Sequence, residues 1–223
     1  MWNHIDEHLI FSDIPGNIMR KWRAANGIET FRNPSNKANG NYYDLDGRLV
    51  TCEHATSRVV RTELDGTITV LATHYDGKEL NSPNDIIVKS DGLIYFSDPS
   101  FGRMEYYGVP REQELDVRGV YRLDPGCGDL TLLASDFDQP NGLCFSLDET
   151  RLFINETMRG HVRVFDVNAD GTISNSRVWA ELKGDREGPA DGMKIDSQGN
   201  LCTTGPGGIH YFGADGTNLG VIY

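Results

Sequence analysis

Residues 82–98 read SPNDIIVKSDGLIYFSD, with a polar Asn84 ahead of an apolar segment, then an Asp-Gly turn, then a second apolar segment that returns. A polar residue, an apolar segment, a turn and a second apolar segment recur three times along the chain, as KANGNYYDLDGRL (37–49), QPNGLCFSLDETRL (139–152) and PADGMKIDSQGNL (189–201), with Asp-Gly, Asp-Glu and Gln-Gly at the turn. The polar residues, called anchors below, are separated by 45, 57 and 50 residues and are Asn39, Asn84, Asn141 and Asp191. A period of about 40 to 50 residues built from short strands is typical of a β-propeller, in which equivalent positions converge on one axis.

A hairpin follows the second strand of each unit. The four hairpins are RVVRTELDGTITVLA (58–72), GVYRLDPGCGDLTLLA (119–134), HVRVFDVNADGTISNSRVWA (161–180) and IHYFGADGTNLGVIY (209–223). Asp-Gly between alternating apolar residues favours a tight hairpin, whose two turn positions both need positive φ. An earlier copy of the unit is visible at HLIFSDI (8–14) and NIMRKWRAANGIETFR (17–32). We therefore expect an all-β chain of about five four-stranded units, without an amphipathic helix.

Length and composition fit one incomplete propeller domain spanning residues 1–223. All-β folds commonly run to about 200 to 250 residues as one unit, and 38% hydrophobic residues can build a core. The formal charge of −12 disfavours nucleic acid and anionic membrane as partners, because phosphate binding needs clustered Lys and Arg. The four cysteines show no C-x-x-C spacing and are expected to be buried thiols. The sequence contains no run of 18 apolar residues, so it predicts no membrane-spanning helix.

The connectivity predicts which loops share a face with the anchors. If each anchor begins a first strand, that strand runs away from its face and the second strand runs back. The loops after the second strands then lie beside the anchors, and they contain His54, Asp98 and Arg103, which we expect to bind substrate. The loop from Ser97 to about Arg118 is the longest, and long loops on a rigid scaffold often form lids or rims.

Two anchors offer the oxygen ligands of a hard divalent cation. Asn141 supplies a neutral oxygen and Asp191 a charged one, which suits Ca²⁺, Mg²⁺ or Mn²⁺. Asn84 and Asn39 could add ligands or bind substrate hydroxyls, and Asn39 is expected to be mainly structural. The opposing interpretation is that Asn-Gly and Asp-Gly only mark tight turns, and four matched copies weaken it. A lone rim histidine such as His54 is more often structural or solvated than catalytic.

The same residues resemble a known family. The stretches NSPNDIIVKSDGLIYFSDPSFG (81–102), FDQPNGLCFSLDETRLF (137–153) and DGMKIDSQGNL (191–201), preceded by TCEHATSRVVRTELDGTITVLA (51–72), are similar to the senescence marker protein, gluconolactonase and luciferin-regenerating enzyme family. The resemblance covers essentially the whole chain. It implies a six-bladed β-propeller with one divalent metal near the central channel and hydrolysis of lactones, typically of sugar acids such as gluconolactone.

The resemblance also assigns roles to individual residues. The family's metal-binding Asn falls on Asn141, and its metal-binding Asp, which is also the expected acid/base, falls on Asp191. The substrate-binding Asn of the central motif falls on Asn84. Some members place an Arg two residues earlier to hold the sugar acid, where this chain has Ser82, so the substrate implied by the resemblance stays open. Ca²⁺ is the expected metal, with Mg²⁺, Mn²⁺ or Zn²⁺ as alternatives.

A further metal ligand of the family, a Glu in an E-G-P-x-W type motif, would fall before Met1. Glu187-Gly188-Pro189 repeats those letters at a place that makes it a poor substitute. We therefore expect about five of six blades, in a fragment or a naturally short relative. The exposed strand edges of an open ring would favour a homodimer.

The sequence thus predicts a metal-dependent hydrolase that opens the ring of a sugar-acid lactone, with Asp191 as acid/base. Two alternatives remain open: a non-catalytic propeller that binds a ligand or a protein, and a phosphotriester hydrolase that uses the same metal pocket. The expected partner is a small-molecule lactone. A cytoplasmic location is expected, with the periplasm as the alternative.

Overall fold

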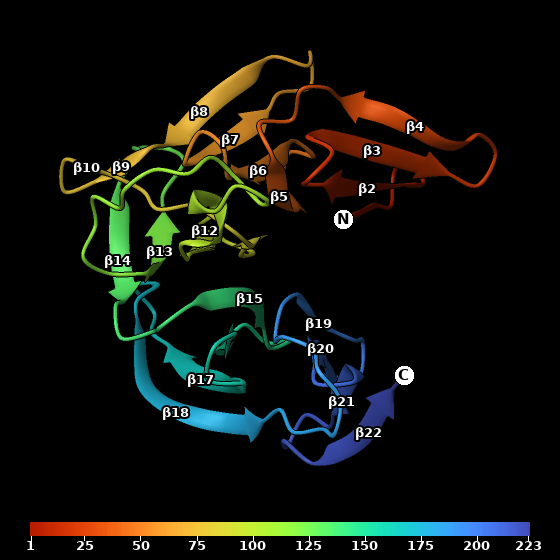
Figure 1. Ribbon diagram of the computed structural model, residues 1–223, viewed down its shortest axis with the longest axis vertical. Coiled ribbons are helices and arrows are strands. Elements are labelled where there is room, and N and C mark those ends of the chain that lie inside the picture. Colours follow the sequence, from red (N-terminus) through yellow and green to blue (C-terminus); the bar gives the residue numbers. More distant parts are fainter.

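Five four-stranded antiparallel sheets follow one another along the chain and are arranged in an open ring about a common axis (Figure 1). The computed structural model describes all residues from 1 to 223. The sheets are called blades 1 to 5. Blade 1 contains β1 (Trp2–Asn3), β2 (His8–Asp13), β3 (Ile18–Arg23) and β4 (Gly27–Arg32), and blade 2 contains β5 (Ala38–Tyr43), β6 (Leu49–Glu53), β7 (Arg58–Thr62) and β8 (Ile68–Ala72).

The long loop that follows the second strand belongs to blade 3, which contains β11 (Ile86–Val88), β12 (Ile94–Asp98), β13 (Gly119–Leu123) and β14 (Leu130–Ala134). Blade 4 contains β15 (Pro140–Phe145), β16 (Arg151–Glu156), β17 (His161–Val167) and β18 (Ile173–Glu181). Blade 5 contains β19 (Met193–Ile195), β20 (Leu201–Gly205), β21 (Gly208–Phe212) and β22 (Asn218–Ile222).

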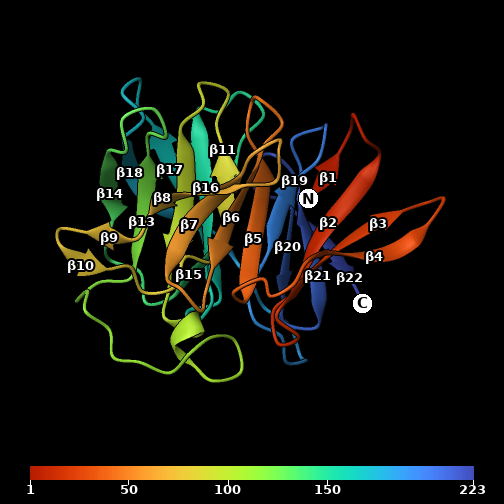
Figure 2. The ribbon, with the colours of Figure 1, turned by 90° about the horizontal axis from the view of Figure 1, so that it is seen from above.

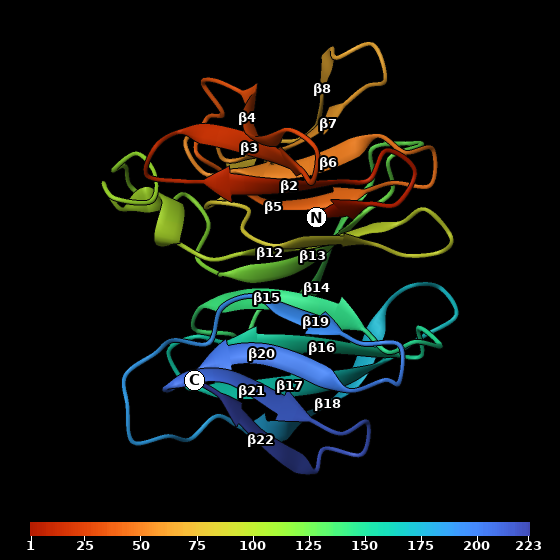
Figure 3. The same ribbon diagram turned by 90° about the vertical axis from the view of Figure 1, so that its right-hand side faces the viewer.

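The predicted repeat is confirmed. In every blade the strands are joined in sequence order, each strand pairing with the next. The innermost strands β5, β11, β15 and β19 contact one another in succession, and β2 contacts β5. Viewed from the side, the blades lie one above another, with blades 1 and 2 at the top and blade 5 at the bottom (Figure 3). The expected fold class, an all-β propeller with about five blades, is therefore correct. The hairpin of β9 (His74–Tyr75) and β10 (Lys78–Glu79), which lies between blades 2 and 3, is not predicted by the repeat.

The hairpin turns differ from the expected geometry at one position. In the predicted hairpins only the glycine has positive φ, for example Gly66 at +86°, whereas the preceding Asp65 does not. Instead, Oδ1 of Asp65 accepts hydrogen bonds from the main-chain N–H and the hydroxyl of Thr67, at 2.9 and 2.7 Å. Aspartate thus closes the turn through its side chain and leaves the left-handed conformation to glycine. The expectation that both turn residues adopt positive φ is wrong for the predicted hairpins, and it holds only at Asp76-Gly77 between β9 and β10.

The hydrophobic core lies between blades. Val88 and Phe96 pack toward blade 2, whereas their neighbours Ile87 and Tyr95 pack toward blade 4, because successive side chains of a strand point to opposite faces. Each inner strand of blade 3 is consequently buried on both faces. Sheets of this kind read as continuous apolar runs. Blades 1 and 2 share a smaller cluster, and blades 4 and 5 share a larger one.

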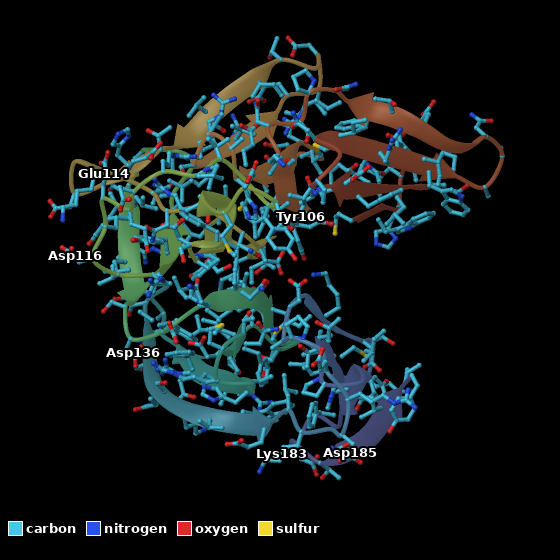
Figure 4. All side chains as sticks on the ribbon, in the orientation of Figure 1. Tyr106, Glu114, Asp116, Asp136, Lys183 and Asp185 are labelled. Atoms are coloured by element: carbon cyan, nitrogen blue, oxygen red, sulfur yellow. The ribbon has the colours of Figure 1, made fainter.

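The long loop of blade 3 contains the only helical segment, the 3₁₀ turn η1 (Phe101–Arg103). No helix in this molecule has the length and apolar character needed to cross a bilayer. The loop projects from the end of the blades where several other connections gather (Figure 2). In Figure 4 Glu114 and Asp116 mark its outer part, whereas Tyr106 lies near the centre of the ring. The loop therefore reaches from the rim toward the axis.

Candidate active site

A cavity of about 270 Å³ lies where the five blades converge. Every blade contributes to its lining, and all four anchors are among the lining residues. The loops after the second strands also reach it, through Ile14, His54, Tyr107 and Thr157. The predicted geometry, in which these loops share a face with the anchors, is confirmed.

The main chain of each anchor is fixed by the preceding blade. The Asn84 carbonyl accepts a hydrogen bond from the Gly40 N–H at 2.8 Å, and the Asp191 carbonyl accepts one from the Gly142 N–H at 3.1 Å. The Asn141 carbonyl accepts a hydrogen bond from the hydroxyl of Ser97 at 2.7 Å. Since the carbonyls are held by the neighbouring blade, the anchor side chains have a fixed starting point at the cavity wall.

Asn141 presents an unpaired acceptor. Its side chain is almost fully buried, and Nδ2 donates a hydrogen bond to the hydroxyl of Thr157 at 3.1 Å. That hydroxyl in turn donates to the Ala190 carbonyl at 2.7 Å, so Thr157 can only accept from Asn141. The orientation of the amide is thereby set, and Oδ1 of Asn141 is buried without a hydrogen-bond partner. A buried polar oxygen without a partner is costly, which points to a ligand that supplies the missing contact.

Asp191 supplies the one carboxylate of the cavity. Its main-chain N–H donates to the hydroxyl of Thr204 at 2.9 Å, and its carbonyl accepts from Nδ2 of Asn155. Although solvent reaches Asp191, the surrounding protein and, second, the negative charge of Asp85 raise the pKa of its carboxyl group above the usual range. A raised pKa brings a carboxylate closer to the range useful for proton transfer at neutral pH.

Asn84 is buried at the cavity wall, and both its main-chain N–H and its main-chain carbonyl are hydrogen-bonded. Its N–H donates to the Ser97 carbonyl at 2.8 Å, and its carbonyl is bonded to Gly40 as described above. No hydrogen bond within the protein involves its side-chain amide, which therefore has a donor and an acceptor available to a ligand in the cavity.

His54 and Asn39 form a bonded pair at the wall. Nδ1 of His54 lies 3.0 Å from the Tyr107 carbonyl, and Nε2 lies 3.2 Å from Nδ2 of Asn39. Burial lowers the pKa of His54 to about 4, because desolvation disfavours the charged imidazolium. His54 is thus neutral and fully engaged. Asn39, expected to be mainly structural, lines the cavity.

Asp98 and Arg103, predicted to bind substrate, do not line this cavity. The buried carboxylate of Asp98 accepts hydrogen bonds from the N–H groups of Asn81 and Ser82, at 2.8 and 2.7 Å. Arg103 donates to the carbonyls of Asn81 and Leu80, both at 2.7 Å. Their position in the loop suggested a substrate role, but the side chains turn inward and bind the segment that leads to Asn84.

Three further lining residues are not among the predicted site residues. Phe101 and Tyr107 come from the long loop, and Thr157 follows a second strand. None of them occupies an anchor position. Thr157 was detectable only as a polar residue one position after β16. Glu187, by contrast, belongs to the residues before Asp191 and does not line the cavity.

The donor set of the cavity fits a divalent cation. Oδ1 of Asn141 is a buried acceptor without a partner, and the Asp191 carboxylate faces the same space. Neutral and charged oxygens are the ligands that hard divalent cations prefer. No group of three or more His, Cys, Asp and Glu residues that could hold a metal occurs in the chain, so the cavity offers one carboxylate together with amide oxygens. Asn141 and Asp191 are thus the residues that would hold such an ion.

A five-bladed propeller arrangement whose convergent polar anchors line a central cavity defines the class of this protein. Comparison with family models matches residues 1–223 to the SMP-30/gluconolactonase/LRE-like region. The chain belongs to the SMP-30/gluconolactonase/LRE-like family. This confirms the expected relationship and the expected enzyme class, a lactonase-type hydrolase.

Two proteins of known sequence are similar to the chain. A gluconolactonase of Zymomonas mobilis is 32% identical over 243 residues, which cover 100% of this chain and 68% of that protein. The diisopropyl-fluorophosphatase of Loligo vulgaris is 27% identical over 165 residues, covering 71% of this chain and 51% of that protein. The chain thus spans about two thirds of the first relative and about half of the second.

Solved structures show the same fold. A gluconolactonase from Xanthomonas campestris superposes with a TM-score of 0.92 at 36% identity, covering 99% of this chain and 73% of that chain. The calcium-binding protein regucalcin of Agrobacterium tumefaciens superposes with a TM-score of 0.79 at 17% identity, covering 99% and 71%. The second comparison concerns the fold alone.

Proposed function

We propose that this chain hydrolyses a sugar-acid lactone such as gluconolactone, with a divalent cation at Asn141 and Asp191. The observation that supports the site most directly is the buried, unpaired Oδ1 of Asn141 on the same cavity as the Asp191 carboxylate. Similarity to gluconolactonases over the full length of the chain supports the substrate class.

Asp191 acts as the acid/base in this proposal. Its carboxylate accepts a proton from water as the water oxygen forms a bond to the lactone carbonyl carbon. The tetrahedral species then breaks its bond to the ring oxygen, and Asp191 returns the proton to that oxygen, which leaves as a hydroxyl group. No covalent bond to the protein forms, and the product is the open hydroxy acid.

The remaining wall residues bind and orient the lactone. The free amide of Asn84 would hydrogen-bond the substrate, and the buried position of its peptide unit keeps that amide in place. A divalent cation, when bound, supplies positive charge that polarises the lactone carbonyl and lowers the pKa of water. Asn141 contributes by holding this ion with an oxygen whose direction is fixed by Thr157.

The test is acid release from D-glucono-1,5-lactone, measured by pH-stat with spontaneous opening subtracted. We expect hydrolysis that EDTA removes and that a divalent salt restores. Asp191→Ala should lower kcat by about 100-fold or more, because general acid/base catalysis contributes about 10²- to 10⁴-fold. Asp185→Ala is the matched control, since Asp185 is an exposed aspartate at the outer side of the ring (Figure 4). Near-normal turnover by Asp191→Ala would refute the assignment.

A second candidate is hydrolysis of a phosphotriester. It is supported by the similarity to the diisopropyl-fluorophosphatase, and the same metal pocket would serve it. Release of 4-nitrophenol from a dialkyl 4-nitrophenyl phosphate, which is a phosphotriester, measured beside lactone hydrolysis with the same variants, separates the two. A wild-type protein that binds a ligand but shows neither activity would favour a non-catalytic binding propeller.

A further inference from the structure

We propose that His54 is a positioning residue that orients the amide of Asn39, so that Oδ1 of Asn39 accepts a hydrogen bond from a hydroxyl group of the substrate. This inference rests on the proposed function and deepens it. It specifies which residues would bind a hydroxyl group of that lactone, and it gives His54 a role through Asn39 rather than in the chemistry.

The protonation of His54 follows from its partners. A carbonyl oxygen can only accept, so Nδ1 of His54 must carry the proton that it shares with Tyr107 at 3.0 Å. His54 is 1% exposed and its pKa is depressed by burial, which keeps the ring neutral. In a neutral imidazole with the proton on Nδ1, Nε2 is an acceptor.

The orientation of Asn39 follows from that acceptor. Only the NH₂ group of the Asn39 amide can donate to Nε2 of His54, at 3.2 Å, so its oxygen points elsewhere. Asn39 is half-buried and lines the cavity, and Oδ1 has no hydrogen-bond partner within the protein. A flipped amide would place two acceptors face to face. His54 therefore selects one of two orientations for Asn39.

His54 also positions the long loop against the cavity. Its ring holds the Tyr107 carbonyl, and Nζ of Lys37 donates to the adjacent carbonyl of Tyr106 at 3.1 Å. Gly102 packs so closely that a Cβ there would lie 2.7 Å from Cβ of His54. The aromatic side chain of Tyr107 consequently lines the cavity from a fixed main-chain position.

The lining indicates what kind of substrate fits. None of the residues that line the cavity is Lys or Arg, and Asp191 is its one carboxylate. The amides of Asn39, Asn84 and Asn141 dominate the polar surface, and Phe101 and Tyr107 supply aromatic faces. Neutral amides bind hydroxyl groups by paired donors and acceptors, and aromatic faces pack against the apolar faces of a sugar ring. Hydroxyl groups on the lactone are therefore the feature recognised.

The experiment measures binding of two unreactive products, D-gluconate and 5-hydroxypentanoate, by NMR titration in buffer containing Ca²⁺. D-Gluconate carries hydroxyl groups on C2 to C6, whereas 5-hydroxypentanoate keeps only the C5 hydroxyl group that ring opening creates. Binding is used because it does not require turnover. The ratio of the two dissociation constants reports recognition of the hydroxyl groups and cancels effects common to both ligands.

Three variants separate the two contacts of His54. His54→Asn keeps a donor near Tyr107 but has no group in the place of Nε2, and His54→Gln keeps an acceptor near Asn39 but loses the donor. Asn39→Leu removes the amide itself. We expect His54→Asn and Asn39→Leu to weaken gluconate binding about 3- to 10-fold relative to 5-hydroxypentanoate, as one hydrogen bond would. His54→Gln should keep most of the wild-type selectivity.

Several outcomes would overturn the inference. One is an equal loss for both ligands in Asn39→Leu, and another is a wild type that binds the two products equally. A third is loss of selectivity in His54→Gln that matches His54→Asn. Asn39 is partly exposed, so Asn39→Leu decides the matter if the buried His54 variants fail to fold. Asp191→Ala distinguishes this from the proposed function, because it should abolish hydrolysis while the selectivity ratio persists.

Discussion

The main-chain N–H of Gly142 donates a hydrogen bond to the carbonyl oxygen of Asp191 at 3.1 Å. The residue after one proposed metal ligand therefore holds the peptide unit of the other. The two ligands are 50 residues apart in sequence and belong to different blades. Their spacing at the cavity is set by a contact between main-chain atoms, and this contact depends on the absence of a side chain at position 142.

The first prediction concerns that contact. A Cβ on Gly142 would overlap the carbonyl oxygen of Asp191, whereas a Cβ on Gly192 would meet no atom within 4 Å. Gly142→Ala should destabilise the fold by about 1 to 3 kcal/mol through overpacking and should also weaken metal binding. Gly192→Ala is the matched control and should be nearly neutral. Urea unfolding and metal titration measure both effects. Equal stability of the two variants would contradict the proposed constraint.

The second prediction concerns the metal. A divalent cation that binds only the folded protein raises the melting temperature, and the stabilisation grows with the logarithm of one plus the ratio of ion concentration to Kd. Adding Ca²⁺, Mg²⁺, Mn²⁺ or Zn²⁺ to the EDTA-treated protein should therefore raise Tm, and the ion with the largest shift identifies the preferred metal. Asn141→Ala should weaken binding by about tenfold or more, as loss of one ligand would. Asn26→Ala, in an exposed turn, is the control and should bind normally.

The third prediction is a pH dependence of stability due to Asp98. Burial raises the pKa of Asp98 to about 7, from about 4 in an unfolded chain. Between these values the folded state binds more protons than the unfolded state. The contribution of Asp98 to the free energy of unfolding is therefore fully present below pH 4 and falls as the pH rises toward 7.

Asp98→Asn should remove this slope. We expect the free energy of unfolding of Asp98→Asn, measured by urea titration at several pH values between 4 and 7.5, to fall less with rising pH than that of the wild type. The contribution of His54 to the free energy of unfolding changes with pH in the opposite direction. Its pKa is lowered to about 4, so this contribution grows as the pH rises from 4 to 6.5. Both proteins share that term, so their difference isolates Asp98. Parallel curves for the two proteins would show that Asp98 does not titrate as described.

The fourth prediction separates two roles of Arg103. Its guanidinium group donates to three main-chain carbonyls, of Leu80, Asn81 and Glu112, and pairs with Glu79 at 2.9 Å. Lysine cannot reproduce this planar set of donors. Arg103→Lys should therefore lower stability by about 2 kcal/mol or more and speed hydrogen exchange across residues 99–118. A raised KM with unchanged Tm and unchanged exchange would instead support the substrate role predicted from sequence.

Much of the fold follows from local sequence. The anchors, the apolar pairs of strands and the Asp-Gly turns specify four-stranded units, because each feature acts within a few residues. Residues such as Ile87 and Val88, apolar in succession, also show that strands are buried on both faces. The periodicity brings Asn39, Asn84, Asn141 and Asp191 to one cavity, as expected for equivalent positions around an axis.

The direction of individual side chains could not be predicted in this way. Asp98 is the last residue of β12, where the expected loop begins, and its carboxyl group turns toward Asn81 and Ser82, because two main-chain N–H groups stabilise it there. Nothing near Asp98 in sequence shows this contact, since its partners lie 16 and 17 residues earlier. Asn39 is the converse case. It was expected to be mainly structural, but its amide lines the cavity in an orientation that depends on His54, from the loop after the next strand.

The sequence alone determined the repeat, the propeller class and the anchors, because strand patterns and turns are written in residues close together along the chain. The tertiary structure decided which polar groups remain free. The unpaired Oδ1 of Asn141 depends on Thr157, the oriented amide of Asn39 depends on His54, and the fixed carbonyl of Asp191 depends on Gly142. Hydrogen-bond satisfaction is settled by contacts between blades and loops, and those contacts exist only after the blades have packed around their axis.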